Sequence, residues 1–390
     1  MNSELNTKER NDVAVKKVRV LMVAPSFDIL GGQSVQAARL FERLKEESSI
    51  EIDFLPINPR LPGVLRQLQR MKYVRTVVTS VAYVVSLLFH AFRYDVLHVF
   101  SASYLSFALA PTPAILIGKL YGRKVLLNYH SGEAEDHLQR WRGTAIPTIR
   151  VVDSIIVPSE YLVRVFASFD LEAHPIYNLI DTRRFQFRDR IPTRPVFLSN
   201  RNFEAHYGVD KILRAFAIIQ QEIPEATLAV AGDGSQREAL HALAAELELK
   251  NTTFLGAVDP HLMPAIYDAA DVYLNASEID NQPLSLLEAY ACGIPIVTTD
   301  AGGIPFIVTN RVNGIMVRCG DVDELARQAV ALLRNPDCTK QMIDRGLKEC
   351  EKYSWSAVKN SWLSVYHQLA NSKSAQIEPL KNSQPKVVSE

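Results

Sequence analysis

Residues 280–305 read DNQPLSLLEAYACGIPIVTTDAGGIP, and this stretch decides the fold. Pro283 suits the first position of a helix, where its missing N–H is not needed, and Asn281 or Gln282 would supply the cap. The apolar run Pro295–Thr299 that follows the helical segment has the length and composition of a strand. The stretch therefore predicts a helix followed by a strand, which is the repeating unit of an α/β sheet.

The start of this predicted helix also carries chemistry. Its first N–H groups have no partner within the helix, and together with the positive end of the helix dipole they form a seat for phosphate or another anion. Glu288, about one and a half turns into the helix, is placed to accept hydrogen bonds from sugar hydroxyls. Asp280 stands just before the helix, so two carboxylates flank one pocket.

The same rhythm of short β-branched runs and longer amphipathic segments extends over most of the chain. Strands are predicted at Val18–Val23, Ile50–Leu55, Val96–Phe100, Lys124–Leu127, Ser154–Val157, Val196–Ser199, Thr227–Ala231, Thr253–Leu255, Val272–Leu274, Pro295–Thr299 and Gly314–Val317. Strands that alternate with helices indicate parallel sheets covered by helices. The fold class is therefore α/β, with two parallel sheets.

At 390 residues the chain is longer than one hydrophobic core usually serves, so two domains are expected. The charged segment Asp181–Arg194 predicts the break between them. Open parallel sheets bind ligands beyond the carboxyl ends of their strands, so loops of both domains would meet across a cleft. No GxGxxG follows a predicted strand, which argues against a nicotinamide enzyme.

The zero net charge hides an asymmetry. Residues 1–190 carry 25 Lys and Arg against 19 Asp and Glu, and residues 191–390 carry 18 against 24, so the halves have net charges of +6 and −6. The basic residues lack interleaved aromatic side chains, which argues against nucleic-acid binding.

The basic excess is concentrated in residues 60–93, which contain no acidic residue. Its cations are Arg60, Arg66, Arg70, Lys72, Arg75 and Arg93. The apolar run Thr76–Phe89 follows Arg75, and basic residues beside an apolar helix are typical of contact with an anionic membrane. The run is shorter than a spanning helix needs, so the alternative is a buried helix of an α/β domain.

The N-terminal residues and the cysteines bear on the cellular compartment and on metal binding. The first 17 residues are polar and charged, which does not fit a secretory signal. A cytoplasmic protein is therefore expected, with a position at the inner face of the membrane as the more specific alternative. The four cysteines lack the CxxC spacing of metal sites and are interpreted as reduced and structural. No metal site and no cofactor are predicted.

Several loops at predicted strand ends could face the cleft. Gly31 and Gly32 precede a helical segment and let backbone N–H groups approach a ligand, although a plain turn explains them equally well. His130 follows the strand at Lys124–Leu127, and Arg201 follows the strand at Val196–Ser199. An arginine there can grip a diphosphate with two parallel hydrogen bonds.

Two further groups are weaker candidates. Gly232 and Gly234 form a tight turn after the strand Thr227–Ala231, most simply structural, with close approach to a nucleotide as the second interpretation. Glu133 and Asp136 follow His130 and are candidates for acceptor binding, although acidic residues in the first turn of a solvated helix explain them more simply.

In this order, these pieces resemble glycosyltransferase family 4, over about residues 18 to 370. The resemblance rests on Gly31-Gly32, His130, Ser159-Glu160-Tyr161-Leu162, Asn178 with Asp181, Arg201 with Gly208-Val209-Asp210, Gly232-Asp233-Gly234, Asp280–Glu288, Gly293–Val297 and Gly302–Pro305. It implies the GT-B fold, in which two Rossmann-like domains face each other. The segment from Tyr353 resembles the last helix of the family, which crosses back onto the first domain.

The resemblance also divides the chain and implies its chemistry. Residues 1–17 would be a flexible N-terminus, 18–187 the acceptor domain, 188–352 the nucleotide-sugar donor domain, 353–371 the crossover helix and 372–390 a disordered tail. The enzyme would transfer a hexose with retention of anomeric configuration and without a metal. The expected donor is a UDP- or GDP-sugar, and the expected acceptor is a glycan or a lipid-linked molecule.

The resemblance implies a role for each site residue. Arg201 would hold the diphosphate, Glu288 the ribose, and the backbone N–H groups around Leu284 and Ser285 the phosphates. Gly31, Gly32 and His130 would line the reacting sugar from the other side. The implied catalytic residues are His130 and Asp280, and the implied donor-binding residues are Gly31, Gly32, Arg201, Gly232, Gly234, Asn281, Leu284, Ser285 and Glu288.

Three positions depart from the family pattern. Asp280 stands where the family usually has Glu, Tyr207 where it has Lys, and Phe306 where it often has Glu. The missing lysine removes a positive charge from the expected diphosphate grip. Asp280-Asn281 resembles a subgroup in which such replacements occur together. The alternatives are a degenerate protein that binds nucleotide sugar or a partner without turnover, and an epimerase of GT-B type.

Overall fold

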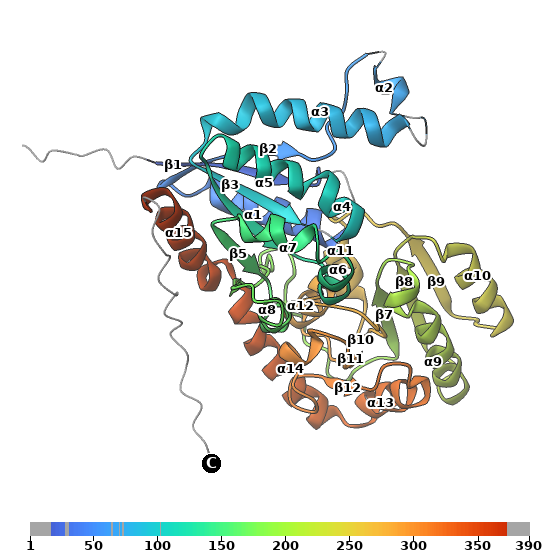
Figure 1. Ribbon diagram of the computed structural model, residues 1–390. Helices are drawn as coiled ribbons and strands as arrows, with labels where there is room; N and C mark the ends of the chain where they lie inside the picture. The colour runs from blue at the N-terminus through green and yellow to red at the C-terminus, as the bar shows by residue number, and fades with distance from the viewer. Residues whose placement is uncertain are drawn as a thin grey trace, which may run out of the picture.

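The computed structural model describes residues 17–27, 31–63, 65–69, 71, 74–101 and 103–372, and these form two parallel six-stranded sheets (Figure 1). The first has the order β2-β1-β3-β4-β5-β6 and the second β12-β11-β10-β7-β8-β9. The strands are β1 Val18–Ala24, β2 Ile50–Pro56, β3 Val96–Ser101, β4 Lys124–Tyr129, β5 Ser154–Val157, β6 His174–Pro175, β7 Val196–Asn200, β8 Thr227–Ala231, β9 Thr252–Gly256, β10 Val272–Leu274, β11 Ile296–Thr299 and β12 Ile315–Val317.

Helices cover both sheets. They are α1 Gly32–Lys45, α2 Leu65–Leu68, α3 Val74–His90, α4 Tyr104–Leu109, α5 Pro111–Leu120, α6 Ala134–Arg140, α7 Ala145–Arg150, α8 Glu160–Ala167, α9 Val209–Glu222, α10 Arg237–Glu246, α11 Met263–Ala269, α12 Leu284–Cys292, α13 Val322–Arg334, α14 Pro336–Cys350 and α15 Trp355–Asn371. Because each sheet is covered on both faces, its strands are nearly continuous apolar runs, and all six residues of β3 are buried.

The predicted strands are all present, and the α/β class with two parallel sheets is confirmed. The two-residue strand β6 was not predicted, because His174-Pro175 is too short to give a pattern. Between β6 and β7 the chain passes from one sheet to the other, and the domain boundary proposed at residues 187 and 188 lies in this segment. Of the proposed tail, residues 373–390 lie outside the described part of the chain, as do residues 1–16 of the proposed N-terminus.

Each sheet has one switch point, where the strand order reverses. In the first sheet it lies between β1 and β3, and in the second between β7 and β10. Ligand sites of open parallel sheets form outside the carboxyl ends of the strands at such points. The loops that follow β1, β7 and β10 carry Gly31, Arg201 and Asp280, so the topology brings these candidates toward each other.

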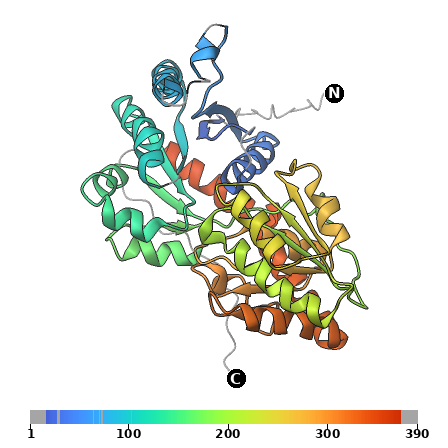
Figure 2. The ribbon, with the colours of Figure 1, turned by 90° about the vertical axis from the view of Figure 1, so that its right-hand side faces the viewer.

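Helix α15 crosses back onto the first sheet (Figures 1 and 2). Its residues Val358, Trp362, Val365, Tyr366 and Leu369 are buried in one hydrophobic cluster with residues of β1, β2 and β3. Ser354 caps the helix, since its hydroxyl oxygen accepts a hydrogen bond from the N–H of Ala357. The crossover helix therefore joins the last part of the chain to the sheet that the first part builds.

Helix α3 lies on the outside of the first sheet, and its full burial, one of the two expectations, is wrong. Only Tyr83 and Leu87 are buried, and Tyr83 donates a hydrogen bond to the carbonyl of Ala110 (2.9 Å). Within the described residues, Val74–Arg93 is the stretch long and apolar enough to cross a membrane by length and composition. It is longer than the predicted run, because the helix includes Val74 and Arg75 and a short turn of 3-10 helix extends it to Arg93.

Candidate active site

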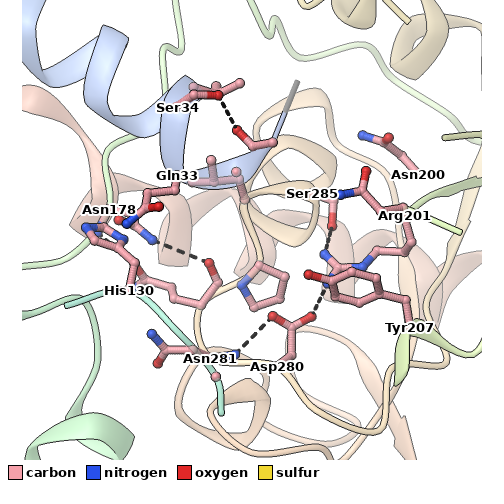
Figure 3. A pocket seen from close by; sticks show the side chains of 18 of the residues that line it. Gln33, Ser34, His130, Asn178, Asn200, Arg201, Tyr207, Asp280, Asn281 and Ser285 are labelled. Carbon is pink, nitrogen blue, oxygen red and sulfur yellow. Dashed lines mark hydrogen bonds and ion pairs between the residues drawn. The ribbon is translucent and has the colours of Figure 1, made fainter. Parts of the chain in front are cut away.

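A cleft of about 630 Å³ lies between the carboxyl edges of the two sheets. From the first half it is lined by the Gly31–Val35 segment, Arg39 and residues 130–133, and from the second by Arg201, Tyr207 and the start of α12. Figure 3 shows His130 and Asn178 on one side and Arg201, Tyr207 and Asp280 on the other. The volume is in the range of small-molecule sites, which is about 300–1,000 Å³.

Helix α12 begins one residue later than predicted. Pro283 lies just before the helix, with φ −65° and ψ 118°, and Leu284 is its first residue. The predicted side-chain cap is wrong, because the side chains of Asn281 and Gln282 bond to the other half of the molecule instead. Ser159 donates to Asn281 Oδ1, and the N–H of Asn178 donates to Gln282 Oε1 (2.7 Å). The start of α12 is therefore tied to the first half and its N–H groups are not capped by these side chains.

Gly302 and Gly303 support the loop at residues 280 and 281. A Cβ atom on Gly303 would lie 2.0 Å from the carbonyl oxygen of Asn281, and one on Gly302 would lie 2.2 Å from that of Asp280. The N–H of Gly303 donates to the Asp280 carbonyl (3.0 Å). Only residues without a side chain allow this approach, so this glycine pair shapes the loop.

Arg201 is held by three residues of its own half. Its Nη2 lies 2.5 Å from Asp280 Oδ2, its Nη1 donates to Ser285 Oγ (3.3 Å), and its Cζ lies 4.1 Å from the centre of the Tyr207 ring (Figure 3). Burial alone would lower the pKa of Arg201, but the Asp280 carboxylate and the neighbouring Tyr207, Tyr273 and Tyr267 together outweigh it, and the net shift is upward. The guanidinium is therefore charged at every pH of interest, and its Nε has no partner among the described residues.

Glu288, the proposed ribose anchor, is buried and paired. Its Oε1 lies 2.7 Å from Nη2 of Arg39, which is contributed by α1 of the first half. Tyr267 is close by, since its hydroxyl donates to the carbonyl of Ser285 (3.2 Å) one turn before Glu288. The Glu288 carboxylate is therefore engaged with Arg39, and it also interacts with the side chain of Tyr267.

His130 is the end of an aromatic column that starts on the crossover helix. Its ring stacks on Phe100 (centroids 5.1 Å apart, planes 12° apart), Phe100 stacks on His98 (4.9 Å), and His98 stacks on Trp362 (5.1 Å). Burial lowers the pKa of His130 to about 3, so the imidazole is neutral at physiological pH. Its Nε2 has no partner within the described residues. A fixed, neutral ring of this kind is suited to one hydrogen bond with a ligand.

The glycines predicted for the donor site fall into two groups. Gly31, Gly32 and Gly232 line the cleft, and a Cβ atom on Gly31 or Gly32 would meet no atom of the described residues within 4 Å. Gly234 is absent from the described lining of the cleft, and a Cβ there would lie 2.7 Å from the Phe203 carbonyl. Gly232 has the same kind of constraint, because its Cβ would lie 2.1 Å from the Arg201 carbonyl. The Gly232–Gly234 turn therefore supports the Arg201 loop.

The two proposed acceptor residues both line a cavity that adjoins the cleft. Glu133 lines the main cleft and also an adjoining cavity of about 700 Å³, which Asp136 lines as well. Asp136 accepts hydrogen bonds from Arg140 Nε (2.8 Å) and from the Tyr104 hydroxyl. The adjoining cavity is reached past Ile279 and Asp280, which line both spaces.

Two site residues were missed by reading the sequence. Arg39 gave no signal, because an arginine in an amphipathic helix is usually solvent-exposed. Gln282 was considered only as a cap. In the part of the chain that the structure describes, no group of three or more His, Cys, Asp or Glu side chains is placed to hold a metal ion.

Comparisons with known proteins agree with this geometry. The family described as Glycosyltransferase Family 4 matches residues 30–184, and that described as Glycosyl transferases group 1 matches residues 181–349. The chain is 26% identical over 290 residues to a sulfoquinovosyl transferase of Arabidopsis thaliana, covering 68% of this chain and 55% of the relative. It is 28% identical over 203 residues to the N-acetyl-alpha-D-glucosaminyl L-malate synthase of Bacillus anthracis, covering 49% and 52%. It thus spans about half the length of these relatives.

Two solved structures are similar along nearly their whole length. HepE of Anabaena, solved in complex with UDP and glucose, has a TM-score of 0.70 at 18% identity, covering 90% of this chain and 99% of HepE. Sucrose-phosphate synthase of Thermosynechococcus elongatus has a TM-score of 0.73 at 19% identity, with the same coverage. At these identities the likeness shows the fold, which is GT-B. Because the two family matches are adjacent and together extend from residue 30 to residue 349, the chain belongs to the GT4-type glycosyltransferases.

Proposed function

We propose that the chain transfers a hexose from a nucleotide-diphosphate donor, UDP- or GDP-linked, to a glycan or lipid-linked acceptor, with retention of anomeric configuration and without a metal. The observation that carries this proposal is the single cleft in which Arg201, the start of α12 and His130 meet. Arg201 and the helix start would neutralise the charge of the leaving diphosphate. HepE, which has the same fold, was solved with UDP and glucose.

Each side of the cleft has its own task in this proposal. The first N–H groups of α12, at Leu284 and Ser285, have no acceptor within the helix and would bind the phosphates. Glu288 would bind the ribose. His130 would donate its ring hydrogen to the transferred sugar from the opposite side. Retention would follow if departure and attack occur on one face, with the leaving phosphate taking the acceptor proton.

We propose that Asp280 contributes to catalysis by positioning Arg201 and not by transferring a proton itself. Its Oδ2 is paired with Arg201 and its Oδ1 accepts the Asn281 N–H (3.0 Å), so both oxygens are engaged. A carboxylate fixed in this way aligns the guanidinium toward the diphosphate. The acceptor would enter from the adjoining cavity past Glu133, and Asp136 would line its path.

The test is a donor screen with product analysis. Purified chain is incubated with UDP-, GDP- and ADP-sugars, with and without a mixture of polysaccharide and glycolipid acceptors, and nucleoside diphosphate release is measured. Release that depends on acceptor, with an unchanged anomeric configuration in the product, supports the proposal. Saturable donor binding with neither transfer nor slow donor hydrolysis would favour the degenerate protein, and conversion of the free donor sugar without acceptor would favour the epimerase.

We also propose that the enzyme works at the inner face of a membrane, with α3 as its contact. Val77, Val81, Val85 and Phe89 recur at helical spacing and are between 45% and 65% exposed. Leu116 and Leu120 of α5 are exposed as well, and the hydroxyl of Tyr121 joins the two helices by donating to the Leu88 carbonyl (3.0 Å). An exposed apolar stripe of this size calls for a partner.

Charge supports an anionic lipid surface as this partner. The exposed Arg66, Arg75 and Arg93 flank the stripe, and no acidic residue lies between Asp53 and Asp95. Arg70 and Lys72, which were predicted to contribute, lie outside the described residues. Basic residues add about 1 kcal/mol each to the attraction of an anionic leaflet.

Vesicle sedimentation tests this contact. The variant Val81→Gln/Phe89→Gln should lose binding to phosphatidylcholine vesicles that contain phosphatidylglycerol, while Arg75→Gln/Arg93→Gln should weaken binding only when the anionic lipid is present. Leu262→Gln removes an equally exposed apolar side chain, 62% exposed, from the other half and serves as the matched control. Unchanged sedimentation of both α3 variants would refute the proposal.

A further inference from the structure

Arg39 is a buried cation at the cleft for which the site has so far given no task. It lies on α1, lines the cleft and is 8% exposed. Its Nη2 is paired with Glu288 of the other half at 2.7 Å, and its Cζ lies 5.5 Å from the centre of the Phe185 ring. The pair thus joins the wall of the first half to the helix that would bind the donor.

The guanidinium is only partly satisfied by this pair. Its Nε and Nη1 are shielded from solvent and have no hydrogen-bond partner among the residues that the structure describes. A buried donor without a partner costs about 1–3 kcal/mol. Such a cost is retained where the missing partner is a ligand, because the ligand then recovers it on binding.

Arg39 is the second arginine of the cleft besides Arg201. Of the described residues that line it, Arg39 and Arg201 are the arginines, and no lysine is among them. Tyr207 packs on Arg201 and supplies no charge. Arg201 reaches α12 at Ser285 and Arg39 reaches it at Glu288, and residues three apart lie on the same face of a helix. Two guanidinium groups therefore approach the first turns of α12 from the two halves.

We propose that Arg39 is a donor-binding residue that binds a phosphate oxygen of a nucleoside diphosphate through its unpartnered Nη1, while Glu288 holds Nη2. The inference rests on the proposed function, since it takes the donor to be a nucleotide. A phosphate is the expected ligand because its anionic oxygens accept charge-assisted hydrogen bonds from a guanidinium N–H. The Nε and Nη1 atoms are both shielded from solvent in the free chain, so this contact would require the side chain to turn about its pair with Glu288.

Calorimetric titration with UDP, GDP and uridine tests the assignment. Arg39→Gln should weaken binding of the preferred diphosphate by about tenfold or more, which is the effect of one charge-assisted hydrogen bond. Uridine binding should fall less, because uridine has no phosphate and is affected only through Glu288. Arg39→Lys keeps a positive charge beside Glu288 but lacks the planar guanidinium that presents a second nitrogen away from Glu288, so it should fold and still bind the diphosphate more weakly. Melting temperatures without ligand verify folding.

Arg43→Gln is the matched control, because Arg43 lies one turn further along α1 and pairs with Asp181 (3.5 Å) outside the lining of the cleft. It should bind UDP, GDP and uridine as the unmodified chain does. If both Arg39 variants bind the diphosphate with unchanged affinity, or lose uridine to the same degree, the assignment to a phosphate is wrong. If the unmodified chain binds neither UDP nor GDP, the proposed donor is wrong, and the two failures are thus distinguished.

Discussion

The two buried arginines of the cleft differ in where their partners come from. Arg201 is held by Asp280, Ser285 and Tyr207, all from the second half, whereas the ion-pair partner of Arg39 lies across the cleft. In the second wall of the cleft, which consists of Arg201, Tyr207, Asp280 and the start of α12, the position of Arg201 is therefore set by contacts within its own half. The first wall consists of the Gly31–Val35 segment, Arg39 and residues 130–133. The position of Arg39 in this wall depends on how the two halves meet, because its partner Glu288 belongs to the other half. We therefore expect that diphosphate binding and the positioning of the transferred sugar can be changed by separate substitutions.

His130 extends the comparison. Its ring is fixed by stacking on Phe100, and the column continues through His98 to Trp362 of the crossover helix. The first wall thus takes its rigidity from aromatic packing and the second from charge. We expect changes in the second wall and at Arg39 to weaken donor binding, and a change of His130 in the first wall to lower turnover.

The largest effect is expected from Arg201→Ala. It removes the main cation from the diphosphate site and leaves the Asp280 carboxylate, 10% exposed, without its partner. The value of kcat/KM for the donor should fall about 10²–10³-fold, as when a preorganised donor is removed from a transition-state site. Initial rates over a range of donor concentrations measure this. Arg237→Ala breaks a 3.1 Å pair with Asp233 that is largely exposed, and it should leave the kinetics unchanged.

His130→Ala should separate the two walls. With the imidazole removed, kcat should fall about 10²-fold while the dissociation constant for the nucleoside diphosphate stays within about twofold of the original. Single-turnover rates and calorimetry give the two quantities independently. The division into a binding wall and a reacting wall fails if diphosphate affinity falls as far as turnover does.

The sequence was sufficient for the fold because period and composition are local properties. Apolar β-branched runs such as Val96–Phe100 are typical of buried strands whatever their place in the fold. The two sheets could therefore be predicted from local composition. Strand β6 was not predicted, because two residues show no periodicity. Residues at strand ends were also predictable as a group, because the carboxyl ends of parallel strands meet at one edge. Arg201 and His130 both line the cleft for that reason.

What could not be predicted depends on contacts between the halves. Asn281 and Gln282 have the composition of helix caps, yet Ser159 and Asn178 compete successfully for their side chains. Arg39 occupies a position that reads as exposed surface until the second half covers it. These partners are distant in sequence, so no local sequence pattern predicts the contacts between them.

A smaller effect is expected from Gly303→Ala, which tests how tightly the second wall is built. The backbone of Gly303, at φ −86° and ψ −5°, is allowed for alanine, but the new Cβ would lie 2.0 Å from the Asn281 carbonyl oxygen. The loop at Asp280 must shift, and donor affinity should fall about tenfold, in keeping with the usual cost of overpacking. Titration with the donor measures the loss. Gly143→Ala introduces the same methyl group where no atom lies within 4 Å and should have no effect.

The smallest effect is a pH dependence of stability that belongs to the first wall. Burial lowers the pKa of His98 from 6.5 to about 3, so between these values the unfolded chain binds a proton that the folded chain does not. Stability is therefore lost as the pH falls through this window, by about 2 kcal/mol for such a histidine between pH 7 and pH 5. Urea unfolding at several pH values measures the slope. His98→Phe keeps the stack but removes the titrating group, so its slope should be shallower, whatever its absolute stability after losing the bond to Tyr366 (2.7 Å). His261→Gln, at an exposed residue of the other half, should keep the original slope. An unchanged slope in His98→Phe would show that the aromatic column does not hold a neutral imidazole.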